Sequence, residues 1–218
     1  MSTSSLLQLG TAALYAANAQ LLTTSHNIAN ANTPGYSRQS VHLATAGSTY
    51  EGSGYYGRGV TVASITRASN QFLTQQAVSA GATAAADGVH RDLLSQLEKV
   101  FAGGSAGLGH AATQVFNAFA DVAAAPGDLS ARQAVLGRLE DFASLARSSS
   151  NQIHALQANL EHDVRGGVEE INTLARDMAK LNAAIAAATR RGQQPNDLLD
   201  QRDELIKRIG SLVEVHAV

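Results

Sequence analysis

The chain has 218 residues, a formal net charge of −2 and no cysteine, and charged residues make up 16% of it. This length suffices for one large domain or two small ones. The weak charge argues against a nucleic-acid footprint and a polybasic membrane patch, and the missing cysteines exclude disulfides, thiolate chemistry and cysteine-based zinc sites.

Alanine makes up a large share of the apolar residues. Alanine accounts for 40 residues, whereas Leu, Ile, Val and Phe together account for 50. Alanine favours helix but buries little area, and at about 25 cal/mol per Å² a thin seam of leucines cannot support a thick core. The composition therefore predicts a mainly α fold, an elongated antiparallel bundle or coiled coil of long helices with a small extended region.

The first expected element is a helix without charge, because no Asp, Glu, Lys or Arg precedes Arg38. Large aliphatic residues recur in it every seven positions and form one stripe: Leu7, Leu14, Leu21 and Ile28. A solitary surface helix usually has a charged outer face, so we expect protein to surround this one. The alternative is an ordinary amphipathic or partly disordered terminus.

Asparagines gather where this helix should end. Asn27 and Asn30 share a helix face, and their neutral amides can satisfy backbone groups at a crowded helix end without burying charge. The helix should stop near residues 30–32, since a type II turn follows, built by Thr33, Pro34, Gly35 and Tyr36. We expect the two asparagines to fix that turn.

An extended, loop-rich connector is predicted over residues 36–66, with strands at Ser40–Leu43 and Val60–Ile65. Its "GSGYYG" (Gly52–Gly57) matches the dinucleotide pattern G-x-G-x-x-G literally. That pattern requires a buried strand before it and a helix after it, whereas a strand-like "RGVTVASI" follows here. We therefore interpret it as a glycine-rich turn.

Helices are predicted over residues 67–212. One should run from about Ser69 to Phe101, with one apolar side: Phe72, Val89, Leu93, Leu97 and Val100. A short helix should follow, with Val115, Phe119 and Val122 on one face, and stop at Pro126-Gly127.

The strongest apolar periodicity begins after Asp128, which can cap a helix. We expect either one helix of nearly sixty residues or two helices in line. The apolar residues step by fours and threes and form a packing seam: Leu139, Phe142, Ile153, Leu156, Leu160, Ile171, Leu174, Leu181 and Ile185. Gly166 and Gly167 interrupt the pattern and predict a bend or break, because each costs about 1 kcal/mol in a helix.

A last helix should start at a cap provided by Asn196 or Asp197. Asp203 with Lys207, and Glu204 with Arg208, are spaced for ion pairs on its outer side. Residues 213–218 read as the start of a strand without a partner, which we interpret as the beginning of a truncated β-rich domain in a longer protein.

Catalysis has no support in the sequence. The seven histidines lack paired ligand spacing, and no nucleophile elbow, P-loop or calcium loop is present. We therefore predict no catalytic residue, no cofactor, no metal and no small-molecule substrate.

The stretch "SHNIANANTPGYSRQ" (Ser25–Gln39) resembles the N-terminal signature of the bacterial flagellar axial proteins of rod, hook and hook–filament junction, roughly N-I-A-N-A-x-T-x-G-Y. "GRGVTVASITRASNQFLTQQ" and "NDLLDQRDELIKRIGSLV" are similar to its hook-associated junction members. His26 departs from the asparagine common there. The resemblance covers nearly the whole chain, at the N-terminal end of longer proteins.

The resemblance implies a structural adaptor at the junction between hook and filament. In that family the N-terminal helix, here residues 1–35, pairs with a C-terminal helix in an inner layer around the axial channel. Without that partner, residues 1 to about 30 are expected to be disordered or loosely packed in isolation. The asparagine turn would also lie beside a contact between subunits.

The partners implied are copies of the chain in a ring, the hook protein, the second junction protein, and the export apparatus with its chaperone; nucleic acid is not among them. The location implied is the extracellular flagellum, after synthesis in the cytoplasm and export without a cleaved signal peptide, and no secretory signal is evident in the sequence. Two alternatives stay open: another axial protein of hook or rod, and a helical membrane-surface or signalling module.

Overall fold

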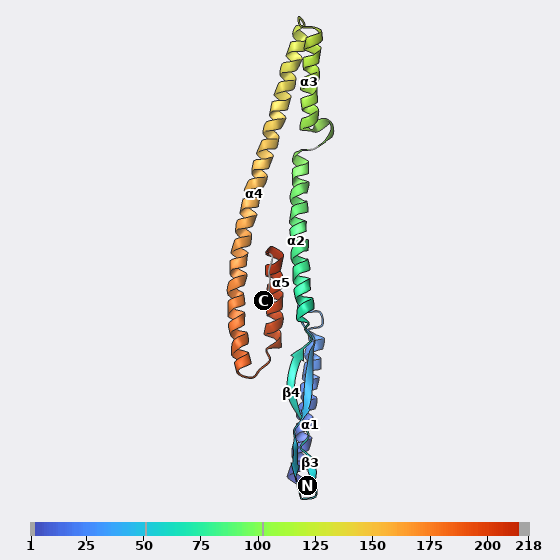
Figure 1. The fold of residues 1–218 in the computed structure, drawn as a ribbon, viewed down its shortest axis with the longest axis vertical. Helices are drawn as coiled ribbons and strands as arrows, with labels where there is room; N and C mark the ends of the chain where they lie inside the picture. Colours follow the sequence, from blue (N-terminus) through green and yellow to red (C-terminus); the bar gives the residue numbers. More distant parts are fainter. Residues whose placement is uncertain (1–2, 51, 102, 214–218) are drawn as a thin grey trace. The chain divides into compact units, whose positions relative to one another are not determined.

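The computed structural model describes residues 3–50, 52–101 and 103–213 of the chain. Its contacts fall into two compact units, one formed by Met1–Ala82 with Ile171–Val218 and the other by Thr83–Glu170. Helices dominate both units, and the described strands form two small antiparallel pairs (Figure 1). The predicted mainly α fold with a small extended region is confirmed.

The first unit begins with helix α1, Thr3–Ala29, followed by a two-stranded ribbon. Strand β1 (Gln39–Thr45) pairs with β4 (Val60–Arg67), so that Gln39 faces Arg67 and Thr45 faces Val60, with a bulge at His42/Leu43. Both predicted strands are confirmed, and each extends further than expected.

A second hairpin lies between these strands. Strands β2 (Ser48–Tyr50) and β3 (Tyr55–Gly57) are antiparallel, and Gly52 between them has a φ of +56°. The segment "GSGYYG" therefore supplies a turn and the strand β3, and strand β4 follows it rather than a helix. This confirms the interpretation as a glycine-rich turn.

Helix α1 packs on β1 and β4 through its small residues. Among the residues of α1 whose burial is described, from Ser5 on, Ala16 and Thr23 are the buried ones, with 3% and 9% of their surfaces exposed. Gly59, with a φ of +91°, allows the close approach, because a Cβ there would lie 2.9 Å from Cδ1 of Leu9. Small side chains let the helix lie near the ribbon backbone.

The rest of the first unit is helical. It contains the first part of α2 (Gln71–Val100), the last part of α4 (Leu129–Arg190) and α5 (Asn196–Leu212). Val78 and Leu174 are buried at 7% and 4% exposure. Helix α5 comes close to α2 at a glycine, since a Cβ on Gly210 would lie 2.9 Å from Cγ1 of Val78.

Two expectations about α5 were wrong. Its N-cap is Pro195, which offers no side-chain cap, and Asn196 is already the first residue of the helix, with its Nδ2 bonded to the carbonyl of Ile65. Asp203 does not pair with Lys207 on the outer side: it binds Arg67 with only 18% of its side chain exposed, and Lys207 lies 3.5 Å from Glu204. Helix spacing could not show which carboxylates turn inward.

The second unit contains the rest of α2, the 3-10 turn Gly104–Ala106, α3 (Leu108–Ala124) and the first part of α4. Val115, Ala118 and Val135 are buried at 7–8% exposure. Asp128 begins α4 as predicted, with its Oδ1 accepting a hydrogen bond of 2.8 Å from the backbone of Ser130. Ser149 is buried and lies 3.5 Å from the carbonyl of Val100.

Some residues predicted to face inward are exposed. Phe72, Val89 and Phe119 expose 72%, 59% and 50% of their surfaces, whereas Ala118 and Val78 are buried on the same helices. The small residues allow close helix contacts, and larger apolar residues remain outside. Periodicity alone does not distinguish these two faces.

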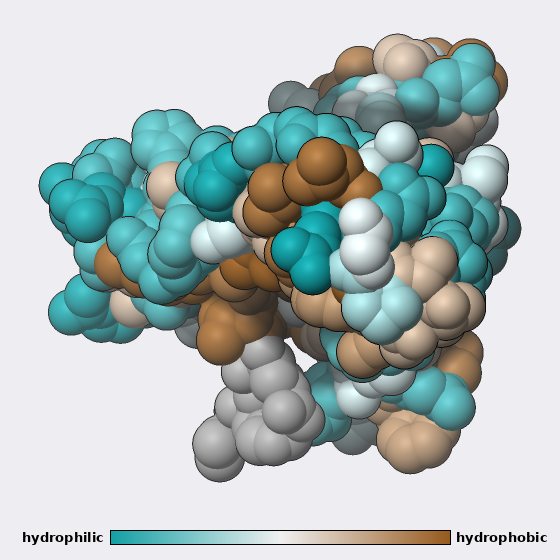
Figure 2. All heavy atoms as spheres, turned by 90° about the horizontal axis from the view of Figure 1, so that it is seen from above, coloured by the Kyte–Doolittle hydropathy of each residue, from teal (hydrophilic) through white to brown (hydrophobic). Residues whose placement is uncertain are grey.

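Helix α4 contains 62 residues and continues through Gly166 and Gly167, so the choice between one helix and two is settled in favour of one. No described side chain is completely buried. Figure 2 shows the same character on one face, where hydrophilic residues predominate and hydrophobic ones form separate patches. These observations agree with thin helix seams rather than a thick core.

Candidate functional site

Polar side chains from distant parts of the first unit meet where α1 ends, β1 begins, β4 ends and α5 begins. We call this set the polar junction: Asn27, Tyr36, Gln39, Arg67, Asn196, Asp200 and Asp203. The residues converge from four elements because the turn after α1 returns the chain to the ribbon, beside the first turns of α5.

Asn27 closes the loop between α1 and β1. Its Oδ1 accepts hydrogen bonds from the hydroxyl of Tyr36, at 2.7 Å, and from the backbone N–H of Gln39, at 2.8 Å. Its Nδ2 donates to the carbonyl of Gln39, also at 2.8 Å. The amide therefore satisfies both backbone groups of one residue without introducing charge.

Asn30 acts within the turn. Its Nδ2 donates to the carbonyl of His26 at 3.0 Å, and its Oδ1 accepts from Thr33 at 3.2 Å. The backbone of Tyr36 bonds back to Thr33, and Gly35 has the positive φ, +79°, that a type II turn requires. Pro34 and Gly35 therefore occupy the two central positions of the turn, as the sequence predicted.

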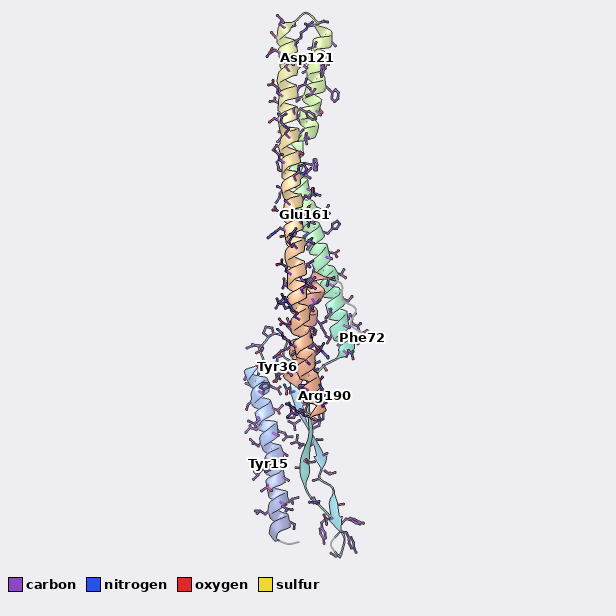
Figure 3. All side chains as sticks on the ribbon, turned by 90° about the vertical axis from the view of Figure 1, so that its left-hand side faces the viewer. Tyr15, Tyr36, Phe72, Asp121, Glu161 and Arg190 are labelled. Carbon is purple, nitrogen blue, oxygen red and sulfur yellow. The ribbon has the colours of Figure 1, made fainter. Side chains whose placement is uncertain are left out.

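The turn also touches α5. A Cβ on Gly35 would lie 3.1 Å from Oε2 of Glu204, so glycine suits this position both for its backbone angle and for the space available. Tyr36 lies at the C-terminal end of α1 (Figure 3), where its ring meets that of His26 edge to face, with centroids 5.4 Å apart.

Arg67 is the charged centre of the junction. It contacts Oδ1 of Asp200 at 2.7 Å and Oδ2 of Asp203 at 2.6 Å. The second oxygen of Asp200 accepts the backbone N–H of Ser37 at 2.9 Å. Burial by itself would lower the pKa of Arg67, but the hydrogen bonds and charges of the two aspartates outweigh it and raise that pKa above its usual value.

Asn196 joins α5 to the ribbon. Its Nδ2 donates to the carbonyl of Ile65 at 2.8 Å and to Oε1 of Gln39 at 3.3 Å, while its buried Oδ1 has no hydrogen-bond partner within the described residues. Gln39 in turn donates to Asp197 at 2.7 Å. One glutamine thus contacts both the N-terminal motif and α5.

The pKa of Tyr36 is raised above 10.0, first by burial and then by the negative charges of Asp197 and Asp200. The hydroxyl therefore stays protonated and can donate to Asn27 at neutral pH.

The predicted leucine stripe has no partner among the described residues. Leu7, Leu14, Leu21 and Ile28 expose 72%, 71%, 65% and 72% of their surfaces. We call this set the leucine face. Leu7 and the buried Ala16 are nine residues apart, which is two and a half helical turns, so the leucine face points away from the ribbon.

The predicted seam of α4 lies in both units. In the first unit Leu174 is buried and Ile171, Leu181 and Ile185 are half-buried. In the second unit Phe142 and Leu156 are half-buried, whereas Leu139, Ile153 and Leu160 are 36–39% exposed.

Sequence reasoning missed Arg67, Asn196 and Asp200 as partners of the asparagine motif. One signal was available: Asn196, Asp200 and Asp203 follow each other at spacings of four and three, which places them on one face of α5. No spacing in the sequence links that face to a strand about 130 residues earlier.

The junction consists of neutral amides and paired charges. Their hydrogen bonds and ion pairs hold the ends of α1, β1, β4 and α5 together. Among the described residues, no set of three His, Cys, Asp or Glu side chains is arranged for a metal ion, and no helix is long and apolar enough to cross a membrane. A helix without ionic groups, with an exposed leucine face and a polar junction that joins it to α5, is typical of a structural protein that assembles by helix packing.

Comparisons with known proteins identify the family. The family model described as "Flagellar hook-associated protein FlgK helical domain" matches residues 94–218, and the model "Flagella basal body rod protein" matches residues 7–36. The first match covers more than half of the chain. The chain belongs to the flagellar hook-associated protein family.

Curated relatives agree with this assignment. The chain is 31% identical over 214 residues to flagellar hook-associated protein 1 of Salmonella typhimurium, covering 97% of the chain and 39% of the relative. The protein of the same name from Bacillus subtilis is 32% identical over 223 residues, covering 98% and 44%. The Escherichia coli K12 protein is 29% identical over 214 residues. The chain thus spans about two fifths of the length of these relatives.

Proposed function

We propose that this chain is part of a structural adaptor of the bacterial flagellum, which forms the junction between hook and filament and performs no catalysis. The family supports this proposal, because the relatives carry the name flagellar hook-associated protein 1. The rod-protein match over residues 7–36 supports the wider class of axial proteins and covers both the leucine face and the asparagine turn.

The observation that carries the proposal is the state of α1. This helix has no ionic group, and the four members of its leucine face each expose 65% or more of their surface. At about 25 cal/mol per Å², leaving four large aliphatic side chains in water forgoes several kcal/mol. An apolar face of this kind marks a surface that other protein segments cover.

The proposed organisation assigns a role to each segment. Residues 1–35 form the inner axial helix, residues 36–66 the connector, residues 67–212 the long-helix bundle, and residues 213–218 the start of a β-rich outer domain. Residues 214–218 lie outside the described part. The polar junction links the end of α1 to α5, since Asn27 binds Gln39 and Gln39 in turn binds Asp197.

The proposed partners are further copies of the chain in a ring, the hook protein and the second junction protein. Cytoplasmic synthesis, with a chaperone and the flagellar export apparatus acting on parts outside these residues, would deliver the protein to the extracellular flagellum.

Deletion of the gene tests the function. The mutant is expected to build hooks, to lack attached filaments and to release filament subunits into the medium, and the wild-type gene should restore motility. Normal filaments in the mutant would overturn the proposal. A mutant that also lacks hooks would instead favour a rod or hook protein, the alternative that the match over residues 7–36 supports.

A further inference from the structure

Two backbone groups fix the orientation of the Asn27 amide. The N–H of Gln39 donates to Oδ1 of Asn27 at 2.8 Å, and the carbonyl of Gln39 accepts from its Nδ2, also at 2.8 Å. A backbone N–H can only donate and a carbonyl oxygen can only accept, so the two ends of this amide cannot be exchanged. The Oδ1 atom of Asn27 is therefore an acceptor for every group that contacts it.

The orientation of this amide determines where the proton of Tyr36 lies. The hydroxyl of Tyr36 is 2.7 Å from Oδ1 of Asn27, and because that oxygen can only accept, the hydroxyl must donate. A phenol has one proton, and this bond uses it. The raised pKa of Tyr36 keeps the proton on the hydroxyl at neutral pH. Toward any other neighbour, the oxygen of Tyr36 is an acceptor.

The other neighbour of this hydroxyl is His26, whose Nδ1 lies 3.1 Å from the oxygen of Tyr36. A ring nitrogen of histidine donates or accepts according to which nitrogen carries the proton, and here the oxygen has no proton left to give. Nδ1 must therefore carry a proton, and in the neutral ring Nε2 carries the lone pair.

The backbone of His26 binds the second asparagine of the motif. Its carbonyl accepts from the backbone N–H of Asn30 at 3.1 Å and from Nδ2 of Asn30 at 3.0 Å. Through its side chain, His26 reaches Asn27 by way of Tyr36. One residue at the end of α1 thus contacts the hydrogen bonds of both asparagines.

We propose that His26 is a positioning residue of this turn: as the Nδ1–H tautomer it donates to the oxygen of Tyr36 and so directs the hydroxyl proton of Tyr36 to Asn27. The chain of hydrogen bonds then runs in one direction, and bonds in such a chain polarise and strengthen one another. The edge-to-face contact of the two rings, with centroids 5.4 Å apart, keeps the nitrogen beside the hydroxyl.

Acid distinguishes a donor at Nδ1 from an acceptor. The second proton of the ring goes to Nε2, so a donating Nδ1–H is kept when the ring becomes charged, whereas an accepting Nδ1 would lose its lone pair. Besides Tyr36, the ionisable groups that line the cavity next to His26 are the carboxyl groups of Asp197, Asp200 and Glu204. A positive ring meets no like charge in that described lining, so acid should not break the contact.

Nitrogen-15 NMR of the natural full-length protein with labelled histidine measures the tautomer directly, because protonated and unprotonated ring nitrogens differ in chemical shift. The His26→Asn variant identifies the His26 signals by their loss. At a pH where the ring is neutral, Nδ1 should carry the proton, and Tyr36→Phe, which removes the acceptor, should lower the population of that tautomer. A neutral wild-type ring protonated at Nε2, or an unchanged population in Tyr36→Phe, would overturn the inference.

Two substitutions of equal shape separate the donor from the bulk of the ring. His26→Asn places an amide nitrogen as many bonds from Cβ as Nδ1, whereas His26→Leu has a similar branched shape without a donor. Only the first keeps the bond to Tyr36, and in the Tyr36→Phe background neither has an acceptor. The ratio of their unfolding constants should therefore differ between the two backgrounds by roughly fivefold, the effect of one ordinary hydrogen bond. Equal ratios would contradict the inference.

The pH profile of the same measurement supplies the last test. The stability advantage of the wild type over His26→Leu should persist as the pH is lowered through the titration of the ring, which the NMR signals follow. Loss of the advantage in that range would identify Nδ1 as an acceptor and overturn the inference. All these measurements use purified protein, so their outcome is independent of the proposed function, which gene deletion tests separately.

Discussion

Arg67 and Asp200 lie 133 residues apart in the chain and form an ion pair of 2.7 Å, with side chains only 11% and 8% exposed. The same guanidinium binds Asp203, and the same carboxylate binds the backbone of Ser37. Because the partners come from β4, α5 and the turn after α1, this ion pair joins the N-terminal motif to the helical part of the first unit.

Replacing Arg67 by Ala should destabilise the first unit by about 3 kcal/mol, because two largely buried carboxylates would lose their counter-charge. Denaturation followed by tyrosine fluorescence measures this unit, since all five tyrosines lie in it. The control is Lys180→Ala, which removes an exposed pair with Asp177 and should change stability by no more than about 0.5 kcal/mol.

Asn27→Ala should cost more than Asn30→Ala. The first change removes three hydrogen bonds to Tyr36 and Gln39 and should cost about 2–3 kcal/mol, whereas the second removes two local bonds and should cost about 1 kcal/mol. The double variant should impair assembly of the junction between hook and filament, and with it motility, while circular dichroism shows the helices intact. Equal costs for the two single variants, or normal motility of the double variant, would contradict this assignment.

Gly210→Ala should destabilise the contact between α5 and α2. The new Cβ would lie 2.9 Å from Cγ1 of Val78, and overpacking of about 1–3 kcal/mol exceeds the gain of about 1 kcal/mol in helix propensity. Adding Val78→Ala should recover part of the loss, which a double-mutant cycle detects. Gly137→Ala is the control: no atom lies within 4 Å of the added Cβ, so this change should be neutral or stabilising.

Tyr36 should make the first unit sensitive to alkaline pH. Its folded-state pKa lies above the unfolded value of 10.0, so the folded state retains the proton longer. The contribution of Tyr36 to the free energy of unfolding is therefore fully present below pH 10.0, and it is lost as the pH rises through the folded-state pKa. Tyr36→Phe removes it, so the stability difference between wild type and variant should shrink above pH 10.0. A difference that is constant with pH would contradict the assignment.

Helix α1 should exchange its amide hydrogens quickly in a dilute monomer, although its backbone is helical in the structure. Its packing on the ribbon is a narrow stripe around Ala16 and Thr23, so opening of the helix ahead of Asn27 should cost little free energy. Hydrogen exchange measures this directly, with α5 as an internal comparison. Strong protection of residues 14–28 in the monomer would refute the prediction.

Local chemistry alone specified much of this fold. The heptad spacing predicted the long helix, Pro34 and Gly35 predicted the turn, and Asp128 was correctly placed as the start of α4, because periodicity, turn angles and caps depend on residues within a few positions of one another. The missing charges of α1 were also visible without a structure.

Only the tertiary structure decided which faces are used. It placed the small residues of α1 against the ribbon and the leucine face outside, and it turned Asp200, Asp203 and Asn196 inward to Arg67, Ile65 and Gln39. Spacing along a helix defines faces but not their partners. The partners depend on contacts between segments more than 100 residues apart, and in this chain those contacts are formed by backbone groups and single charges that no local pattern reveals.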